Sequence, residues 1–189
     1  MEIRPTPIAG CLEICPPRFQ DERGSFVKTY QRDFFLQQNL VTDWQEEYYS
    51  ISKAGVLRGL HFQTPPHDHE KLVHCARGKA LDVVVDLRLG SPTYGKHHLV
   101  ELDSASANML YIPRGLAHGF LALEDDTLMM YRVASLHAPS HDAGILWDSC
   151  GIAWPTDAPV LSERDLRWPA FSDFKTPFVF DPGLETKGD

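Results

Sequence analysis

Residues 80–88 read ALDVVVDLR, and in this stretch Leu81, Val83, Val85 and Leu87 stand at alternate positions. An apolar residue at every second position is typical of a β-strand with one buried face. The turn signal Leu-Gly-Ser-Pro follows at once over residues 89–92. We therefore predict a half-buried strand over residues 80–88.

Similar short segments recur on both sides of this strand. Turn residues separate apolar runs that predict strands over residues 56–63, 71–76, 97–102, 109–112, 118–123 and 128–133. Because no long helical pattern interrupts them, the strands predict an antiparallel sandwich or barrel. One helix is expected over residues 32–39, and a short one near residues 162–165, where Ser162 can act as N-cap. The Pro-rich segment from about residue 155 should wrap a single domain spanning residues 1–189, with residues 186–189 frayed.

Composition narrows the range of partners. The chain has 189 residues, is 43% hydrophobic and carries a net charge of −8, which indicates a globular protein and disfavours non-specific nucleic-acid binding. The sequence has neither a run of about 20 apolar residues that could cross a bilayer nor a signal peptide at its start. The four cysteines include no CxxC pair and fit free thiols in a reducing compartment. We expect a cytoplasmic protein with no nucleic-acid or membrane partner.

Several polar side chains lie inside the predicted strands. Burying such groups is costly unless they find partners, so a row of them in a small barrel indicates a cavity. The sequence contains no Gly-rich phosphate loop and no GxSxG nucleophile elbow. The candidates for chemistry are therefore the strand residues Arg58, His61, Gln63, Lys71, His74, His118 and Tyr131.

Nine ordered blocks carry a resemblance to a known family. They are residues 19–26 (FQDERGSF), 55–63 (GVLRGLHFQ), 71–73 (KLV), 82–88 (DVVVDLR), 90–95 (GSPTYG), 112–120 (IPRGLAHGF), 131 (Y), 144–147 (GILW) and 161–165 (LSERD). Over roughly residues 5–170 the chain resembles the dTDP-4-dehydrorhamnose 3,5-epimerases. The resemblance implies an all-β, cupin-type jelly-roll barrel of antiparallel strands with a few short helices. It also implies a homodimeric isomerase without cofactors that makes deoxysugar precursors, such as those of lipopolysaccharide.

The resemblance also implies roles for individual residues. His61 is the expected base, with Asp165 fixing its tautomer. Lys71 stabilises the oxyanion at C4, and Tyr131 returns a proton from the other side of the sugar ring. Two arginines, Arg23 and Arg58, are expected to hold the diphosphate. Phe19, Lys28, Glu46, Tyr48, Gln63 and His118 are the remaining expected substrate contacts, although His118 could equally form a structural hydrogen bond.

Spacing bears separately on metal binding. Many metal-binding cupins resemble G-x5-HxH, E-x6-G and P-x-G-x-x-H in series. Here Gln63 and Lys71 occupy two of the four ligand positions, while His61 and His118 occupy the others. An ammonium cannot ligate a cation, which indicates a metal-free site. A metal-dependent dioxygenase or sugar isomerase, and a non-catalytic nucleotide-sugar-binding cupin, stay open as alternatives.

A second group of histidines allows a rival interpretation. His67, His69 and His74 have spacings that zinc sites use, although the first two stand in what reads as an exposed loop. We expect solvated loop histidines there, with a metal site or a substrate contact as the alternatives.

The sequence departs from the family pattern near the expected nucleotide site. Lys28 replaces a common Glu, Glu46 and Tyr48 replace a Gln-x-Asn pattern, and His137 replaces a common Tyr. In the family these regions lie near the nucleotide, partly across a dimer interface where an N-terminal strand is exchanged. The catalytic positions are kept, so we expect epimerisation at C3 and C5 of a nucleotide-linked 4-dehydro-6-deoxyhexose. A dTDP sugar is the first choice, CDP and GDP sugars are possible, and epimerisation at C3 alone is the alternative.

Overall fold

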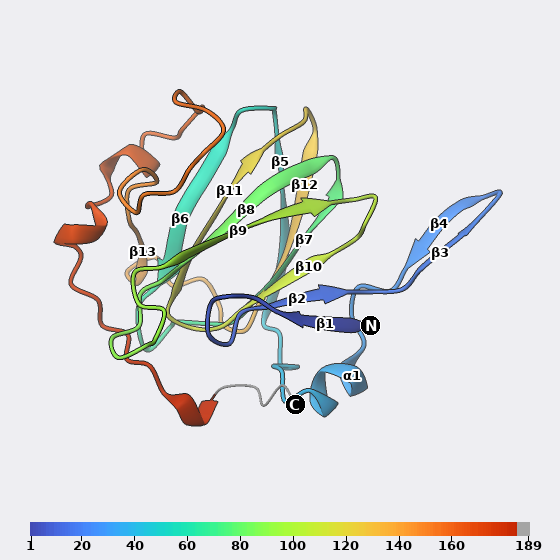
Figure 1. Ribbon diagram of the computed structural model, residues 1–189, viewed down its shortest axis with the longest axis horizontal. Coiled ribbons are helices and arrows are strands. Elements are labelled where there is room, and N and C mark those ends of the chain that lie inside the picture. Colours follow the sequence, from blue (N-terminus) through green and yellow to red (C-terminus); the bar gives the residue numbers. More distant parts are fainter. Residues whose placement is uncertain (185–189) are drawn as a thin grey trace.

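Two antiparallel sheets pack face to face in the computed structural model, which describes residues 1–184 (Figure 1). The first sheet has the strand order β1-β2-β10-β7-β12-β5, formed by Glu2–Pro5, Leu12–Cys15, Met109–Ile112, Lys71–Arg77, Thr127–Val133 and Glu46–Ser52. The second has the order β13-β6-β11-β8-β9, formed by Asp142–Gly144, Leu57–Gln63, Leu116–Ala122, Lys79–Asp86 and His97–Asp103. The described helices are short: α1 (Arg32–Gln37) and the 3-10 turns η1 (Asp165–Arg167), η2 (Phe171–Asp173) and η3 (Pro182–Leu184). The prediction of an all-β antiparallel fold is confirmed.

Every strand predicted from the alternating pattern is present, with ends shifted by at most a few residues. Six further strands, β1 to β5 and β13, were not predicted. Two of these, β3 (Arg18–Asp21) and β4 (Gly24–Val27), form a separate hairpin that projects away from the two sheets (Figure 1). β5 is an edge strand whose sequence, EEYYSIS, carries mostly polar residues and tyrosines, so it lacks the apolar alternation that reveals the other strands.

The expectation of a half-buried strand over residues 80–88 is wrong in one respect, because both faces are buried. Val83 and Val85 pack outward against Phe178 of the C-terminal segment, while Val84 faces the core between the sheets. Asp82 on that inner face has no exposed surface. An alternating pattern identifies a strand but does not reveal a later segment of the chain that covers its second face.

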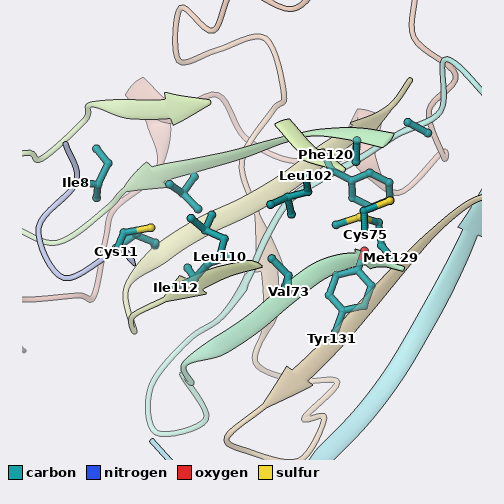
Figure 2. Packing of buried hydrophobic residues seen from close by; sticks show 14 residues of the cluster. Ile8, Cys11, Val73, Cys75, Leu102, Leu110, Ile112, Phe120, Met129 and Tyr131 are labelled. Carbon is teal, nitrogen blue, oxygen red and sulfur yellow. The ribbon is translucent and has the colours of Figure 1, made fainter. Parts of the chain in front are cut away.

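The main core lies between the sheets. Figure 2 shows side chains of this cluster converging from both sheets, among them Val73, Leu110, Phe120 and Met129. Fully burying a large apolar side chain stabilises a fold by about 1.5–3 kcal/mol. Tyr131 belongs to the same cluster, so the packed core continues up to the residues that surround the cavity described below.

The C-terminal segment covers the outer face of the second sheet, on the side of β6 and β13 (Figure 1). The Thr176 hydroxyl donates a 2.6 Å hydrogen bond to the Leu87 carbonyl, and the Phe178 carbonyl accepts one from the Leu89 N–H. Ser162 does not begin a helix at the expected place, but its hydroxyl accepts a 3.1 Å hydrogen bond from the Asp165 N–H at the start of η1. The expected fraying of residues 186–189 lies outside the described residues.

No helix within residues 1–184 combines the length and the hydrophobicity that a bilayer crossing requires.

Candidate active site

A cavity of about 460 Å³ opens between the two sheets. The first sheet contributes Tyr48, Ser50 and Tyr131 to its lining, and the second contributes Arg58, His61 and His118. This volume falls in the range of ligand sites, about 300–1,000 Å³. Six of the seven predicted polar strand residues therefore line a common space, whereas His74 does not.

His61 on β6 is paired with a carboxylate that is distant in sequence. Its Nε2 forms a short hydrogen bond with Oδ1 of Asp165, which is 3% exposed at the start of η1. Burial lowers the pKa of His61 below its usual value, and the hydrogen bond to Asp165 offsets part of this effect. Burial raises the pKa of Asp165, but its interactions with His61, Ser162 and Arg164 together outweigh this and hold the pKa below the usual range. With Nε2–H donated to Asp165, Nδ1 is the nitrogen that can accept a proton.

A pair of glycines allows β6 to approach β11 closely. Gly59 has φ +137°, and a Cβ at this position would lie 2.5 Å from the Cα of Gly119. A side chain there would force the strands apart. The close approach places His61 opposite His118 in the antiparallel ladder, which explains why the block at residues 55–63 contains a glycine two positions before the histidine.

Lys71 begins β7 in the opposite sheet and is 7% exposed. Its Nζ donates a single long hydrogen bond, 3.4 Å, to the His61 carbonyl. Burial lowers its pKa to about 8, against the opposing effect of Asp142 and Asp82. An ammonium has three donors, so it retains donors for an oxygen of a ligand in the cavity.

Tyr131 lies on β12, in the sheet opposite to His61. Its ring is 8% exposed, and its hydroxyl lies 3.3 Å from the hydroxyl of Ser50. Burial raises the pKa of this phenol, so the group is protonated at neutral pH and can act as a donor. The two groups predicted to move protons thus come from opposite walls of the cavity.

His118 forms a second buried histidine–aspartate pair. Its Nε2 lies 2.8 Å from Oδ2 of Asp82, and the two residues are 4% and 0% exposed. Burial raises the pKa of Asp82, although His118 acts against this. Oδ1 of Asp82 is buried without a hydrogen-bond partner among the described residues. His118 therefore makes a structural hydrogen bond and also lines the cavity, so both roles expected for it are compatible with its position.

The other predicted contacts in the cavity are held by hydrogen bonds to neighbouring segments. Arg58 donates from Nε to the Ser52 hydroxyl at 3.1 Å and is exposed at the cavity mouth. Gln63 has its amide engaged with residues 135–138: its Oε1 accepts the Ala138 N–H at 2.6 Å. Glu46 accepts the N–H of His137 at 3.0 Å, and both line the cavity.

Three predicted substrate contacts do not reach the cavity of this chain. Phe19 and Arg23 lie on the β3–β4 hairpin, and Lys28 follows it directly. Arg23 pairs with Asp21 within the hairpin, and Phe19 is 61% exposed. None of the three lines the cavity. Within one chain the structure therefore separates them from His61.

Sequence reasoning missed two charged residues of the cavity wall. Asp142 on β13 and Arg164 form a 3.0 Å ion pair beside Asp165, and the Arg164 guanidinium lies over the Trp168 ring at 5.4 Å. Both residues stand inside or next to blocks quoted for the resemblance, at residues 144–147 and 161–165. Their position in those blocks was the available signal, but only the fold brings them together across 22 residues.

The histidines of the rival metal interpretation have other surroundings. His69 lies 2.7 Å from the Ser135 hydroxyl through Nδ1, and His67 packs against the ring of His141. His74 lines a small outer pocket, together with Leu72 and Arg132. Within residues 1–184 no three His, Cys, Asp or Glu side chains are grouped as metal ligands.

Two sheets of antiparallel strands around a cavity with inward polar side chains define a cupin-type jelly-roll barrel. Residues 5–173 match the profile of the dTDP-4-dehydrorhamnose 3,5-epimerases. The chain belongs to this family, which confirms the resemblance drawn from the sequence.

Curated relatives and solved structures agree with this assignment. The dTDP-4-dehydrorhamnose 3,5-epimerase of Methanothermobacter thermautotrophicus is 40% identical over 168 residues, 86% of this chain and 90% of the relative. A dTDP-4-dehydrorhamnose 3-epimerase of Streptomyces niveus is 39% identical over 87% of this chain and 81% of the relative. A 3,5-epimerase of Legionella pneumophila, solved with dTDP-4-keto-L-rhamnose, superposes with a TM-score of 0.86 at 31% identity, covering 97% of this chain and 96% of that one.

Proposed function

We propose that this protein is an isomerase that inverts C3 and C5 of a dTDP-4-dehydro-6-deoxyhexose. One observation carries the proposal: the paired base His61–Asp165, the ammonium of Lys71 and the phenol of Tyr131 line one cavity. Inversion beside a ketone requires a base, a group that stabilises the enolate and an acid on the other face, and these three side chains meet that requirement.

The first half of each inversion removes a proton. His61 Nδ1 takes the hydrogen from the carbon next to the C4 ketone, and the electron pair of that C–H bond moves to form the enolate. The negative charge then rests on the C4 oxygen, where the buried Lys71 ammonium stabilises it in a site of low dielectric constant. Asp165 stabilises the imidazolium that forms.

The second half returns a proton from the opposite side. The Tyr131 hydroxyl gives its proton to the same carbon, and the C4 ketone re-forms. The phenolate then recovers a proton from solvent and the His61 imidazolium releases the proton that it took, so both groups are restored for the second carbon. Because Tyr131 and His61 belong to opposite sheets, the proton arrives on the face opposite to the one it left. The configuration of the carbon is thereby inverted.

A homodimer is part of the proposal. Phe19, Arg23 and Lys28 lie away from the cavity of their own chain, and the hairpin exposes Phe19 and Phe26 at 61% and 62%. Insertion of this hairpin into a second copy would cover both rings and bring Arg23 towards a diphosphate that Arg58 holds from within the chain.

The location and the use of the product complete the proposal. The four cysteines of the described residues are free thiols, which fits a protein of the reducing cytoplasm. The product would serve as a precursor for polysaccharides such as lipopolysaccharide.

Hydrogen exchange with heavy water tests the proposed function. The protein is incubated in D₂O with dTDP-, CDP- and GDP-linked 4-dehydro-6-deoxyglucose, and deuterium at C3 and C5 is followed by NMR. We expect exchange at both carbons, at least about tenfold faster with the dTDP sugar, which corresponds to about 1.4 kcal/mol of selectivity. Exchange at C3 alone would establish the 3-epimerase alternative, and no exchange with any sugar would refute the proposal.

The pH profile of kcat/KM should be bell-shaped. His61 must be neutral to accept a proton, so activity falls as the pH drops through its pKa, which burial places below the usual value. Lys71 must be charged to stabilise an oxyanion, so activity falls again as the pH rises through its pKa of about 8. Initial rates over pH 4–10 measure both limbs. A constant rate between about pH 7 and 10 would contradict the role given to Lys71.

A further inference from the structure

Tyr48 and Tyr131 lie directly opposite one another in the β5–β12 ladder. Their rings stack with centroids 4.9 Å apart and planes inclined by 17°. Opposite residues of an antiparallel pair point to the same side of the sheet, here toward the cavity, which both tyrosines line. Tyr48 is 45% exposed, whereas Tyr131 is 8% exposed, so Tyr48 forms the outer layer of the stack.

The hydroxyl of Tyr131 is held from the same strand. Ser50 stands two residues after Tyr48, on the same face of β5, and its hydroxyl lies 3.3 Å from that of Tyr131. β5 thus contacts Tyr131 at two points: the ring of Tyr48 stacks on the ring of Tyr131, and the hydroxyl of Ser50 lies beside its hydroxyl. Tyr48 forms no hydrogen bond of its own with Tyr131, so its effect on the phenol comes through contact between the rings.

The direction of the Tyr131 hydroxyl matters because the reaction has two target carbons. C3 and C5 flank C4, so a hydroxyl held at one point cannot approach both equally. C5 carries a methyl group where C3 carries the smaller hydroxyl group, which leaves a narrower approach to C5 than to C3. Reprotonation at C5 therefore depends more strongly on how well the phenol is oriented.

We infer that Tyr48 is a positioning residue: its ring holds Tyr131 in the orientation that delivers a proton to C5, and it thereby sets the ratio of C5 to C3 epimerisation. The inference rests on the proposed function and concerns a feature of this chain, the tyrosine–tyrosine stack at the cavity mouth.

Two substitutions of Tyr48 test the inference in the full-length protein. Tyr48→Leu keeps an apolar side chain in the strand but removes the ring, and Tyr48→Phe keeps the ring but removes the hydroxyl. Deuterium incorporation from D₂O into the dTDP sugar is measured separately at C3 and C5. For Tyr48→Leu we expect the C5:C3 ratio to fall about 3- to 10-fold, as loss of an aromatic pair permits. Tyr48→Phe should retain the wild-type ratio.

The neighbouring Tyr49 offers a matched control. It lies on the outer face of the same strand, is 63% exposed and does not line the cavity, so Tyr49→Leu should leave the ratio unchanged. The inference is overturned if Tyr48→Leu keeps the wild-type ratio, if Tyr49→Leu lowers it equally, or if Tyr48→Phe lowers it. The last result would assign the effect to the Tyr48 hydroxyl.

Failure of the inference can be told apart from failure of the proposed function. Wild-type protein that exchanges both carbons establishes the function, whatever the Tyr48 variants do. Wild-type protein that exchanges C3 alone overturns the positioning role, because no C5 step then exists for Tyr131 to serve. Wild-type protein that exchanges neither carbon refutes the function and the inference together.

Discussion

Replacement of His61 by asparagine is expected to lower kcat by about 10²- to 10⁴-fold, the usual contribution of a positioned base. Asparagine has no group that can accept a proton at neutral pH. Its amide nitrogen takes the place of Nδ1 and not of the Nε2 that bonds Asp165, so the variant also loses the hydrogen bond that ties η1 to β6. Initial rates of deuterium incorporation measure the fall in kcat.

Binding separates a catalytic role of His61 from a structural one. Calorimetric titration with dTDP should give an affinity within about threefold of wild type, since His61 is proposed to contact the sugar rather than the nucleotide. His97→Asn on the edge strand β9 is the matched control, because His97 is not among the cavity residues, and its activity should be unchanged. An active His61→Asn variant would remove the base from the mechanism.

Replacement of Lys71 by methionine is expected to lower kcat by about 10²- to 10³-fold, as loss of an oxyanion-stabilising donor does. Methionine fills a similar volume but offers no donor to the C4 oxygen. Lys71 is 7% exposed and makes a 3.4 Å hydrogen bond to a carbonyl, so the protein compensates its charge poorly. Because burial of an ammonium is unfavourable, the variant should unfold at the same temperature as wild type or a higher one.

The combination of lost activity and retained stability is the informative result. Lys79→Met is the control: Lys79 pairs at the surface with Glu101 and Asp103, outside the cavity, and its loss should leave kcat unchanged. If Lys71→Met kept more than about a third of the wild-type kcat, the oxyanion would need another stabilising group. A marked drop in thermal stability would instead point to a structural role for the lysine.

Strands could be predicted where apolar and polar residues alternate, or where a short apolar run lies between turn residues. Residues 80–88 show the first pattern and residues 128–133 the second, and β8 (Lys79–Asp86) and β12 (Thr127–Val133) form there. β5 escaped prediction because an edge strand faces solvent on one side and a polar cavity on the other, so its sequence carries no apolar period. Because β5 was not predicted, the contacts of Ser50 and Tyr48 with Tyr131 could not be predicted either.

The residues of the candidate site also fall into those that the sequence could indicate and those that it could not. His61, Lys71 and Tyr131 could be proposed from blocks of sequence, since each stands in a short motif whose order is specific. The pair of Asp142 and Arg164 could not, because an ion pair between β13 and the turn before η1 leaves no period or spacing in the chain. Nor could residue order show that Arg23 lies on a projecting hairpin, away from the cavity that Arg58 lines.

The amino-acid order by itself determined the strand-rich architecture, the family and the candidates for the proton-moving side chains, because strand periodicity and motif spacing are local properties. The tertiary structure decided that Asp142 pairs with Arg164, that both faces of β8 are buried and that Tyr48 covers Tyr131. These contacts depend on which strands become neighbours and on where the C-terminal segment packs. The pairing of strands and the packing of the C-terminal segment depend on the apolar surface buried by the whole chain, so no short stretch of sequence specifies them.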